Sequence, residues 1–126
     1  KFNPDAVSGK DARGLMQIIP STGKWAAEKM GLSDYKEKSL LDPETNIKIG
    51  CWYLRYLSDQ FPDDWELVIA SYNAGIGNVK KWLKNKEYSP DGKKLETIPY
   101  LETRSYVDEV LKTYKIYREI YPSLKI

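Results

Sequence analysis

The chain of 126 residues is 41% hydrophobic and 30% charged, which is the composition of one globular domain. A net charge of +2 is too small to indicate a nucleic-acid-binding protein, and the apolar runs are too short to span a membrane. The sequence has no histidine, which excludes Ser-His and Cys-His nucleophiles and most catalytic metal sites, so we expect no metal and no cofactor.

The hydrophobic residues recur at helical spacing and lack the alternation of a strand, so we expect an all-α fold of about six helices. In chain order, the predicted helical segments are 14–19 (a helix or a turn), 25–30, 43–61, 65–74, 79–83 and 99–121. Two connecting stretches are expected to be loops, namely a polar one that runs to Leu41 and a flexible excursion over 85–97.

In the first half of the chain, particular residues determine where the predicted helices begin and end. Ser21 or Thr22 can cap the helix that follows it, and Gly31 ends that helix. The carboxylate of Asp42, with Pro43 in the first turn, is expected to cap the long helix after it.

Breaker and cap residues recur in the second half of the chain. The segment Pro62-Asp63-Asp64 is expected to break the long helix and to cap the next one. Gly75 ends that helix, after which Asn78 can cap a short basic helix over 79–83.

The long helix over 43–61 has an apolar face that we expect to be buried. Its members recur at helical spacing and are Ile47, Cys51, Leu54, Leu57 and Phe61, while Lys48, Arg55 and Asp59 take the solvent side. Because the chain has one cysteine, Cys51 cannot form an internal disulfide and is expected to be a core thiol. The final helix is expected to carry one apolar face made of Val107, Val110, Leu111, Tyr114, Tyr117 and Tyr121.

A single stretch around the end of the fourth predicted helix stands out. Tyr72 and Asn73 come directly before Gly75 and Gly77. The glycines supply bare backbone that another chain, such as a polymeric ligand, can approach closely. A phenol and an amide at that point suit a hydroxyl-rich sugar, although a plain helix end and turn would also explain the pattern. The ten tyrosines and four tryptophans are likewise open to two interpretations, a carbohydrate groove or a core.

Four blocks of sequence, in order, resemble the soluble lytic transglycosylase family. The blocks are Gly14–Thr22, Asp42–Ile47 with Gly50 and Tyr53–Leu54, Ser71–Gly75, and Ile98–Val107. Together they span nearly the whole chain. The resemblance implies a single lysozyme-like helical domain over residues 1–126, built around a glycan-binding cleft.

The resemblance also implies an enzyme that cleaves peptidoglycan between N-acetylmuramic acid and N-acetylglucosamine and leaves a 1,6-anhydromuramoyl end. In this family one carboxylic acid protonates the leaving glycosidic oxygen. The resulting carboxylate then takes the proton of the muramoyl 6-hydroxyl as that oxygen closes on the anomeric carbon. The expected partner is therefore a peptidoglycan strand outside the cytoplasmic membrane, and we expect a monomer without nucleic acid and without a membrane span in this segment.

The catalytic glutamate of the family is expected to lie outside this sequence. The family places it in a Glu-Ser-x-aromatic-x-Pro motif, and only the tail of that motif is present here, as Lys1–Pro4. By that alignment the glutamate falls before Lys1. The chain opens without a methionine, so we expect a piece of a longer protein that lacks its N-terminal helix and is inactive alone. A smaller departure is Ser71, which stands where the family commonly has alanine.

The resemblance assigns roles around the scissile bond. Tyr72 would orient the glutamate that is absent from the chain, and Asn73 would fix the same corner of the cleft. Gln17 would hydrogen-bond the sugar next to the scissile bond, while Met16 would pack beneath the cleft. Met16 is expected to be core whatever else it does.

Three further residues are assigned to substrate binding. Ser8 would contact an N-acetyl group, Glu102 would meet the peptide stem, and Tyr106 would close the groove. For each residue a simpler interpretation stays open: Ser8 could shape a turn, Glu102 could be a helix N-terminal charge, and Tyr106 could be packing.

Three alternatives to the leading interpretation stay open. The chain could be a wall-binding module without catalysis, since Asp11 and Glu28 are poor substitutes for the missing acid. It could also be a hydrolytic lysozyme of the same fold, which would need a base to hold a water. Nucleic-acid binding through the basic stretch 79–86 is the third alternative.

Overall fold

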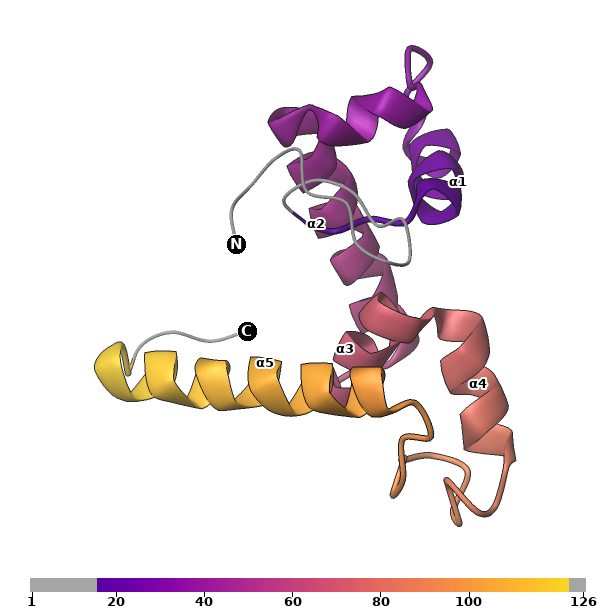
Figure 1. Ribbon diagram of the computed structural model, residues 1–126, viewed down its shortest axis with the longest axis vertical. Helices are drawn as coiled ribbons and strands as arrows, with labels where there is room; N and C mark the ends of the chain where they lie inside the picture. Colours follow the sequence, from indigo (N-terminus) through magenta and orange to yellow (C-terminus); the bar gives the residue numbers. More distant parts are fainter. Residues whose placement is uncertain (1–15, 123–126) are drawn as a thin grey trace. The chain divides into compact units, whose positions relative to one another are not determined.

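The computed structural model describes residues 16–122, and residues 1–15 and 123–126 lie outside the described part. In chain order the elements are α1 (Pro20–Met30), the 3-10 helix η1 (Glu37–Leu41), α2 (Pro43–Gln60), α3 (Trp65–Ala74), α4 (Ile76–Lys84) and α5 (Leu101–Ile120) (Figure 1). The described residues therefore form five α-helices and one 3-10 helix. This confirms the all-α fold that the helical spacing predicts.

The chain divides into two compact units, Lys1–Tyr56 and Leu57–Ile126, and the boundary lies inside α2. Each unit has its own cluster of buried apolar side chains and is described by itself. The expectation that residues 1–126 form one domain stays a prediction.

In the first unit, α1 begins five residues before the predicted helix. Pro20 occupies the first turn, and Ile19 precedes it as an N-cap without a side-chain hydrogen bond, so the prediction of a Ser21 or Thr22 cap is wrong. Proline has no backbone N–H and fixes a helical φ, so it can start the helix without a capping side chain. The predicted end is confirmed, because Gly31 has a φ of 75° in the left-handed region.

The loop expected between α1 and α2 is partly helical. Residues Glu37–Leu41 form η1, and Leu40 is 0% exposed. Leu40 joins a core cluster with Ile18, Ala26 and Ile49. The residues just before Leu40 are polar, so the hydrophobic pattern does not predict this short helix.

The start of α2 follows the predicted chemistry. The Asp42 carboxylate accepts hydrogen bonds from the Thr45 N–H at 3.0 Å and from the Thr45 hydroxyl at 2.8 Å. The hydroxyl bond and then the backbone bond lower the pKa of Asp42. Asp42 is therefore a true N-cap of α2.

The face of α2 that is buried differs from the predicted one. Ile47 is 43% exposed and Cys51 is exposed, so the prediction of a core thiol is wrong. Leu57 is buried, as predicted, and the other buried residues of α2 are Asn46, Ile49, Gly50 and Tyr53. The predicted solvent-side residues Lys48, Arg55 and Asp59 are exposed, as expected.

Asn46 explains this difference, because it is a polar residue at the centre of the buried face. It is 0% exposed. Its Oδ1 accepts a hydrogen bond from the Met16 N–H at 2.7 Å, and its Nδ2 donates to the Leu40 carbonyl at 2.8 Å. A satisfied buried amide costs little, and a hydrophobic pattern does not reveal it.

Aromatic residues of the first unit pack on one another. The Trp25 ring meets the Trp52 and Tyr56 rings edge-on, with centroids 5.3 Å and 4.9 Å apart. Trp52 and Tyr56 stack one helical turn apart on α2. For these residues the structure favours packing over the lining of a groove.

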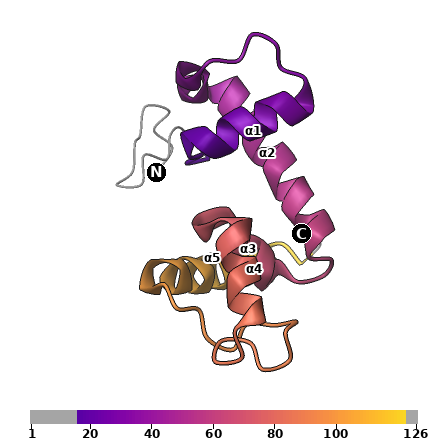
Figure 2. The same cartoon turned by 90° about the vertical axis from the view of Figure 1, so that its right-hand side faces the viewer.

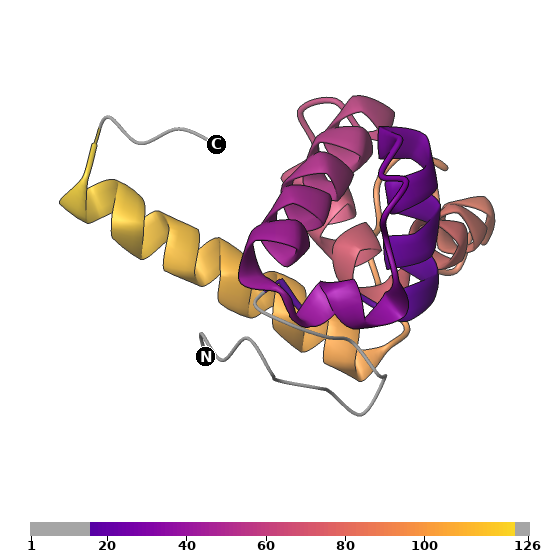
Figure 3. The ribbon, with the colours of Figure 1, turned by 90° about the horizontal axis from the view of Figure 1, so that it is seen from above.

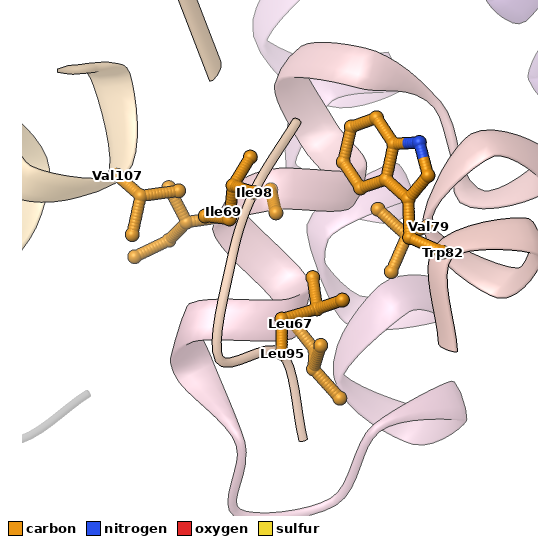
Figure 4. Close-up of a cluster of buried hydrophobic side chains, with 8 residues drawn as sticks. Leu67, Ile69, Val79, Trp82, Leu95, Ile98 and Val107 are labelled. Carbon is orange, nitrogen blue, oxygen red and sulfur yellow. The ribbon is translucent and has the colours of Figure 1, made fainter. Parts of the chain in front are cut away.

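The second unit packs α4 and α5 against α3 (Figure 2). The Asp64 carboxylate accepts a hydrogen bond from the Leu67 N–H at 3.1 Å, which confirms a cap of α3 within the predicted segment 62–64 and identifies it as Asp64. Figure 4 shows the core of this unit. The buried cluster consists of Leu67, Ile69, Ala70, Val79, Trp82, Leu95, Ile98 and Val107.

The stretch 85–97 contains no helix, as predicted, but it is tied to the second unit. Leu95 is 7% exposed and belongs to the core cluster. Ser89 is buried, and its hydroxyl donates to the Lys94 carbonyl. The Asp91 carboxylate accepts from the Lys93 and Lys94 N–H groups at 2.8 and 3.0 Å. This loop therefore supplies part of the core of the second unit, and its flexibility stays a prediction.

α5 packs against the core cluster of the second unit as far as Leu111. Val107 is 2% exposed, and Val110 and Leu111 pack against the core cluster. Tyr117 and Tyr121, predicted on the same face, are 52% and 58% exposed, and the second half of α5 extends past α3 and α4 (Figures 1 and 3). Among residues 16–122, no helix combines the length and apolar character that crossing a membrane requires.

We predict that Asn46→Leu, which is close to isosteric, lowers the free energy of unfolding by about 2–4 kcal/mol, because it leaves the Met16 N–H and the Leu40 carbonyl without their partner. Urea unfolding measures the change. Lys48→Ala, at an exposed position on the same helix, should change it by no more than about 0.5 kcal/mol. Equal effects of the two substitutions would contradict the anchoring role of Asn46.

Candidate functional site

Tyr72 and Asn73 lie in the last turn of α3, and both are half-buried. Gly75 follows with a φ of 95°, and its N–H donates to the Ser71 carbonyl at 2.8 Å. α4 begins at the next residue, so one glycine ends α3 and precedes α4. The prediction that a glycine stops the helix at this point is confirmed.

The predicted cap of α4 is wrong. α4 begins at Ile76, and Asn78 lies within it. The Asn78 Nδ2 donates to the Ala74 carbonyl at 2.8 Å and thus satisfies the end of α3. Asn78 therefore stabilises the sharp turn between the two helices.

The backbone beside this turn is bare. A Cβ atom added to Gly75 or Gly77 would meet no heavy atom within 4 Å. Gly75 needs to be glycine because of its positive φ. Gly77 has neither a positive φ nor a close neighbour to explain it, so the surface there can admit another molecule close to the main chain.

A partly buried hydrogen bond joins the end of α3 to the start of α5. The Thr103 hydroxyl donates to the Asn73 Oδ1 at 2.7 Å, and Thr103 is 0% exposed. α3 and α5 pack against each other within the second unit. The structure thus brings together the two segments that the sequence singles out in this unit, Ser71–Gly75 and Ile98–Val107.

Two predicted site residues lie on this part of α5. Glu102 is exposed in the first turn of the helix. Tyr106 is half-buried and packs against the core cluster. Burial, and then the neighbouring Glu109, raise the pKa of Tyr106, which keeps its phenol protonated. Tyr106 therefore has a packing role, and its assignment to a ligand groove stays a prediction.

Sequence reasoning overlooked the two residues that follow Glu102. Besides the Thr103 bond, the Arg104 guanidinium donates from Nη2 at 2.9 Å and from Nε at 3.3 Å to the Ile98 carbonyl. Arg104 thereby holds the segment before α5 in place. Glu-Thr-Arg in consecutive positions was the available signal, but only the fold shows which partner each side chain meets.

In the first unit, Met16 and Gln17 form a turn before α1. A Cβ on Gly50 would lie 2.7 Å from the Met16 Cγ, so Met16 packs closely on the bare backbone of α2. This confirms the core role of Met16. Gln17 is exposed and has a φ of 49°, which is uncommon for a residue with a side chain. The Asn46 bond to the Met16 N–H holds this turn.

Ser8 lies outside the described residues. Gln17 belongs to the first unit, whereas Tyr72, Asn73, Glu102 and Tyr106 belong to the second. The expectation that Gln17 borders the same groove as Tyr72 and Asn73 stays a prediction.

Within the second unit, the carboxyl group of Glu66 on α3 is one candidate for the expected general acid. Burial, and then Asp64 and Asp108, raise the pKa of Glu66, which lines a cavity of about 470 Å³ with Glu96, Arg104 and Asp108 among its walls. However, Glu66 is in the first turn of α3, roughly 9 Å along the helix axis from Tyr72. Glu28 is exposed on α1, and Asp11 lies outside the described part. Residues 16–122 also contain no group of three His, Cys, Asp or Glu side chains that could hold a metal ion.

Comparisons with known proteins agree on one family. Residues 1–95 match the family model described as "Transglycosylase SLT domain". The soluble lytic murein transglycosylase of Salmonella typhimurium is 42% identical over 119 residues, which are 93% of this chain and 18% of that protein. The chain therefore spans about a fifth of the length of the curated relatives it matches.

Two solved structures are similar to this chain over more than nine-tenths of its length. The 70 kDa soluble lytic transglycosylase of Escherichia coli has a TM-score of 0.79 and 40% identity, over 94% of this chain and 20% of that one. The lytic transglycosylase Slt of Pseudomonas aeruginosa, solved as an inactive glutamate-to-glutamine mutant, has a TM-score of 0.79 and 38% identity, over 98% and 20% of the two chains.

We predict that Ser71→Ala raises the free energy of unfolding by about 1 kcal/mol, because Ser71 is 0% exposed and its hydroxyl has no hydrogen-bond partner in the described part of the chain. Ser89→Ala is the matched control, since Ser89 is equally buried but donates to the Lys94 carbonyl. That control should be destabilising. Thermal unfolding of both variants checks the prediction, and a loss of stability in Ser71→Ala would contradict it.

Proposed function

The chain belongs to the transglycosylase SLT domain family, and on this basis we propose that it is the glycan-cleaving domain of a peptidoglycan lytic transglycosylase. The bond broken joins N-acetylmuramic acid to N-acetylglucosamine, and the product carries a 1,6-anhydromuramoyl end. The observation that carries the proposal is the family match over residues 1–95, because it includes the Tyr72–Asn73 segment. The 42% identity to a soluble lytic murein transglycosylase supports it.

The proposed chemistry needs one carboxylic acid. The acid protonates the glycosidic oxygen, and the bond to the anomeric carbon breaks. The carboxylate then removes the proton of the muramoyl 6-hydroxyl as that oxygen bonds to the anomeric carbon, so the acid is regenerated and no water is consumed. These reaction steps differ from those of ordinary glycosidases, in which a second carboxylate acts as nucleophile or base.

We assign the acid to a glutamate outside residues 16–122, as the sequence resemblance does. In the Pseudomonas aeruginosa relative, a glutamate-to-glutamine mutant is inactive. The Tyr72 phenol would donate a hydrogen bond to this glutamate and orient it.

The remaining residues would bind the glycan. Asn73 is positioned beside the bare backbone of Gly75 and Gly77, where a sugar chain can approach closely. Gln17 is exposed on a turn that Asn46 holds, so its amide can meet a ligand. Glu102, exposed at the start of α5, is available to the peptide stem.

The proposed substrate fixes where the domain acts. Peptidoglycan lies outside the cytoplasmic membrane, so we propose that the domain works there, as a monomer on one glycan strand. Ser8, Met16 and Tyr106 complete the proposed site, with Met16 beneath the cleft and Tyr106 at its edge.

Mass spectrometry of purified peptidoglycan digested with the full-length protein tests the proposal. We expect muropeptides with 1,6-anhydromuramoyl ends, each lighter by one water than a hydrolysis product. Products with reducing ends only would indicate a hydrolytic lysozyme of this fold and contradict transglycosylation. Binding to peptidoglycan without any product would indicate a wall-binding module and contradict the enzyme proposal.

A substitution in the proposed site tests the role of Tyr72 in the same digestion experiment. Tyr72→Phe removes a hydrogen bond to a charged group and should lower kcat/KM about 10–100-fold. Tyr117→Phe removes the same hydroxyl from an exposed tyrosine on the second half of α5 and should leave kcat/KM unchanged. Equal rates for the two variants would exclude Tyr72 from the proposed site.

A further inference from the structure

We propose that Thr103 is a positioning residue, which fixes the orientation of the Asn73 carboxamide so that its Nδ2 donates to an acceptor oxygen of the glycan. The inference rests on the proposed function and adds a residue to the same site. It starts from one contact, the 2.7 Å hydrogen bond from the Thr103 hydroxyl to the Asn73 Oδ1.

A carboxamide has two ends of opposite character, an acceptor oxygen and a donor NH₂ group. A rotation of 180° exchanges them with almost no change in shape. In this structure the Thr103 hydroxyl donates to the oxygen, so the oxygen is engaged toward α5. The NH₂ group of Asn73 is therefore the end that remains for a ligand, and no acceptor for it occurs among residues 16–122.

The burial of Thr103 protects the hydrogen bond that fixes the orientation of the Asn73 carboxamide. Thr103 is 0% exposed, so bulk water does not reach the residue to replace its contact. A threonine hydroxyl within a helix often bonds to a carbonyl of its own preceding turn. Here it reaches a side chain on another helix, 30 residues away in sequence. The contact thus links the start of α5 to the side-chain amide of Asn73, two residues before Gly75.

The surroundings of Asn73 indicate the chemistry of the ligand atom. The adjoining turn offers bare backbone at Gly75 and Gly77, with open space beside both. An NH₂ donor at that place suits a carbonyl or hydroxyl oxygen on a sugar, and an acetamido carbonyl is a strong acceptor of this kind. The orientation set by Thr103 would therefore favour N-acetylated sugars over sugars that offer only a donor there.

Thr103 could instead serve only to pack α5 on α3, and the two roles differ in a measurable way. A packing role lowers stability and lowers activity equally whether or not Asn73 is present. A positioning role acts through the Asn73 amide, so its effect on activity must vanish when that amide is removed. Restoring a hydroxyl without the methyl group must also restore activity.

The experiment measures kcat/KM for peptidoglycan in the full-length protein. We expect Thr103→Val to lower it about 10-fold and Thr103→Ser to restore most of it, since serine keeps the donor. In an Asn73→Ala background, Thr103→Val should cause no further loss. Thr113→Val, an exposed threonine on the same helix, is the matched control and should match the parent protein.

Asn73→Asp gives an independent test that does not depend on the folding of the valine variant. Aspartate keeps an acceptor oxygen for Thr103 but lacks the NH₂ donor, so we expect a loss as large as that of Asn73→Ala. Full activity of Asn73→Asp, or an equal loss from Thr103→Val with and without Asn73, would overturn the inference. An inactive parent protein would instead overturn the proposed function, so the two failures are distinguishable.

Discussion

The hydrogen bond between Thr103 and Asn73 is the contact on which the candidate site depends. A single bond of this kind contributes only about 1 kcal/mol net to stability, but leaving its buried partner unpaired costs more. It holds the end of α3 against the start of α5 at the point where Gly75 forces the chain to turn. The apolar core packs the two helices, and this bond determines which chemical group they present.

In the first unit, Asn46 similarly holds a segment of the candidate site in place. Its amide is fully buried and bonds to the Met16 N–H on one side and to the Leu40 carbonyl on the other. The turn that carries Gln17 is thereby held in an uncommon backbone conformation. In both units, a buried polar side chain within the helical framework supports the segment that the resemblance assigns to the glycan.

The sequence predicts well what local chemistry determines and poorly what depends on the fold. Asp42 and Asp64 are recognisable as caps because their bonds reach only three residues along the chain. The buried face of α2 departs from the hydrophobic pattern because the polar Asn46 lies within it, whereas Cys51 is exposed. The partner of Thr103 could not be identified from the sequence, since Asn73 is 30 residues away and no periodicity links the two positions.

The central claim, that the end of α3 presents an amide donor to a glycan, is tested most directly by NMR of the ¹⁵N-asparagine-labelled full-length protein with a peptidoglycan fragment. The account predicts that the side-chain NH₂ resonances of Asn73 shift as the fragment is added. Those of Asn46, whose NH₂ is buried against the Leu40 carbonyl, should stay in place. An Asn73 amide that does not respond to a bound fragment would contradict the account.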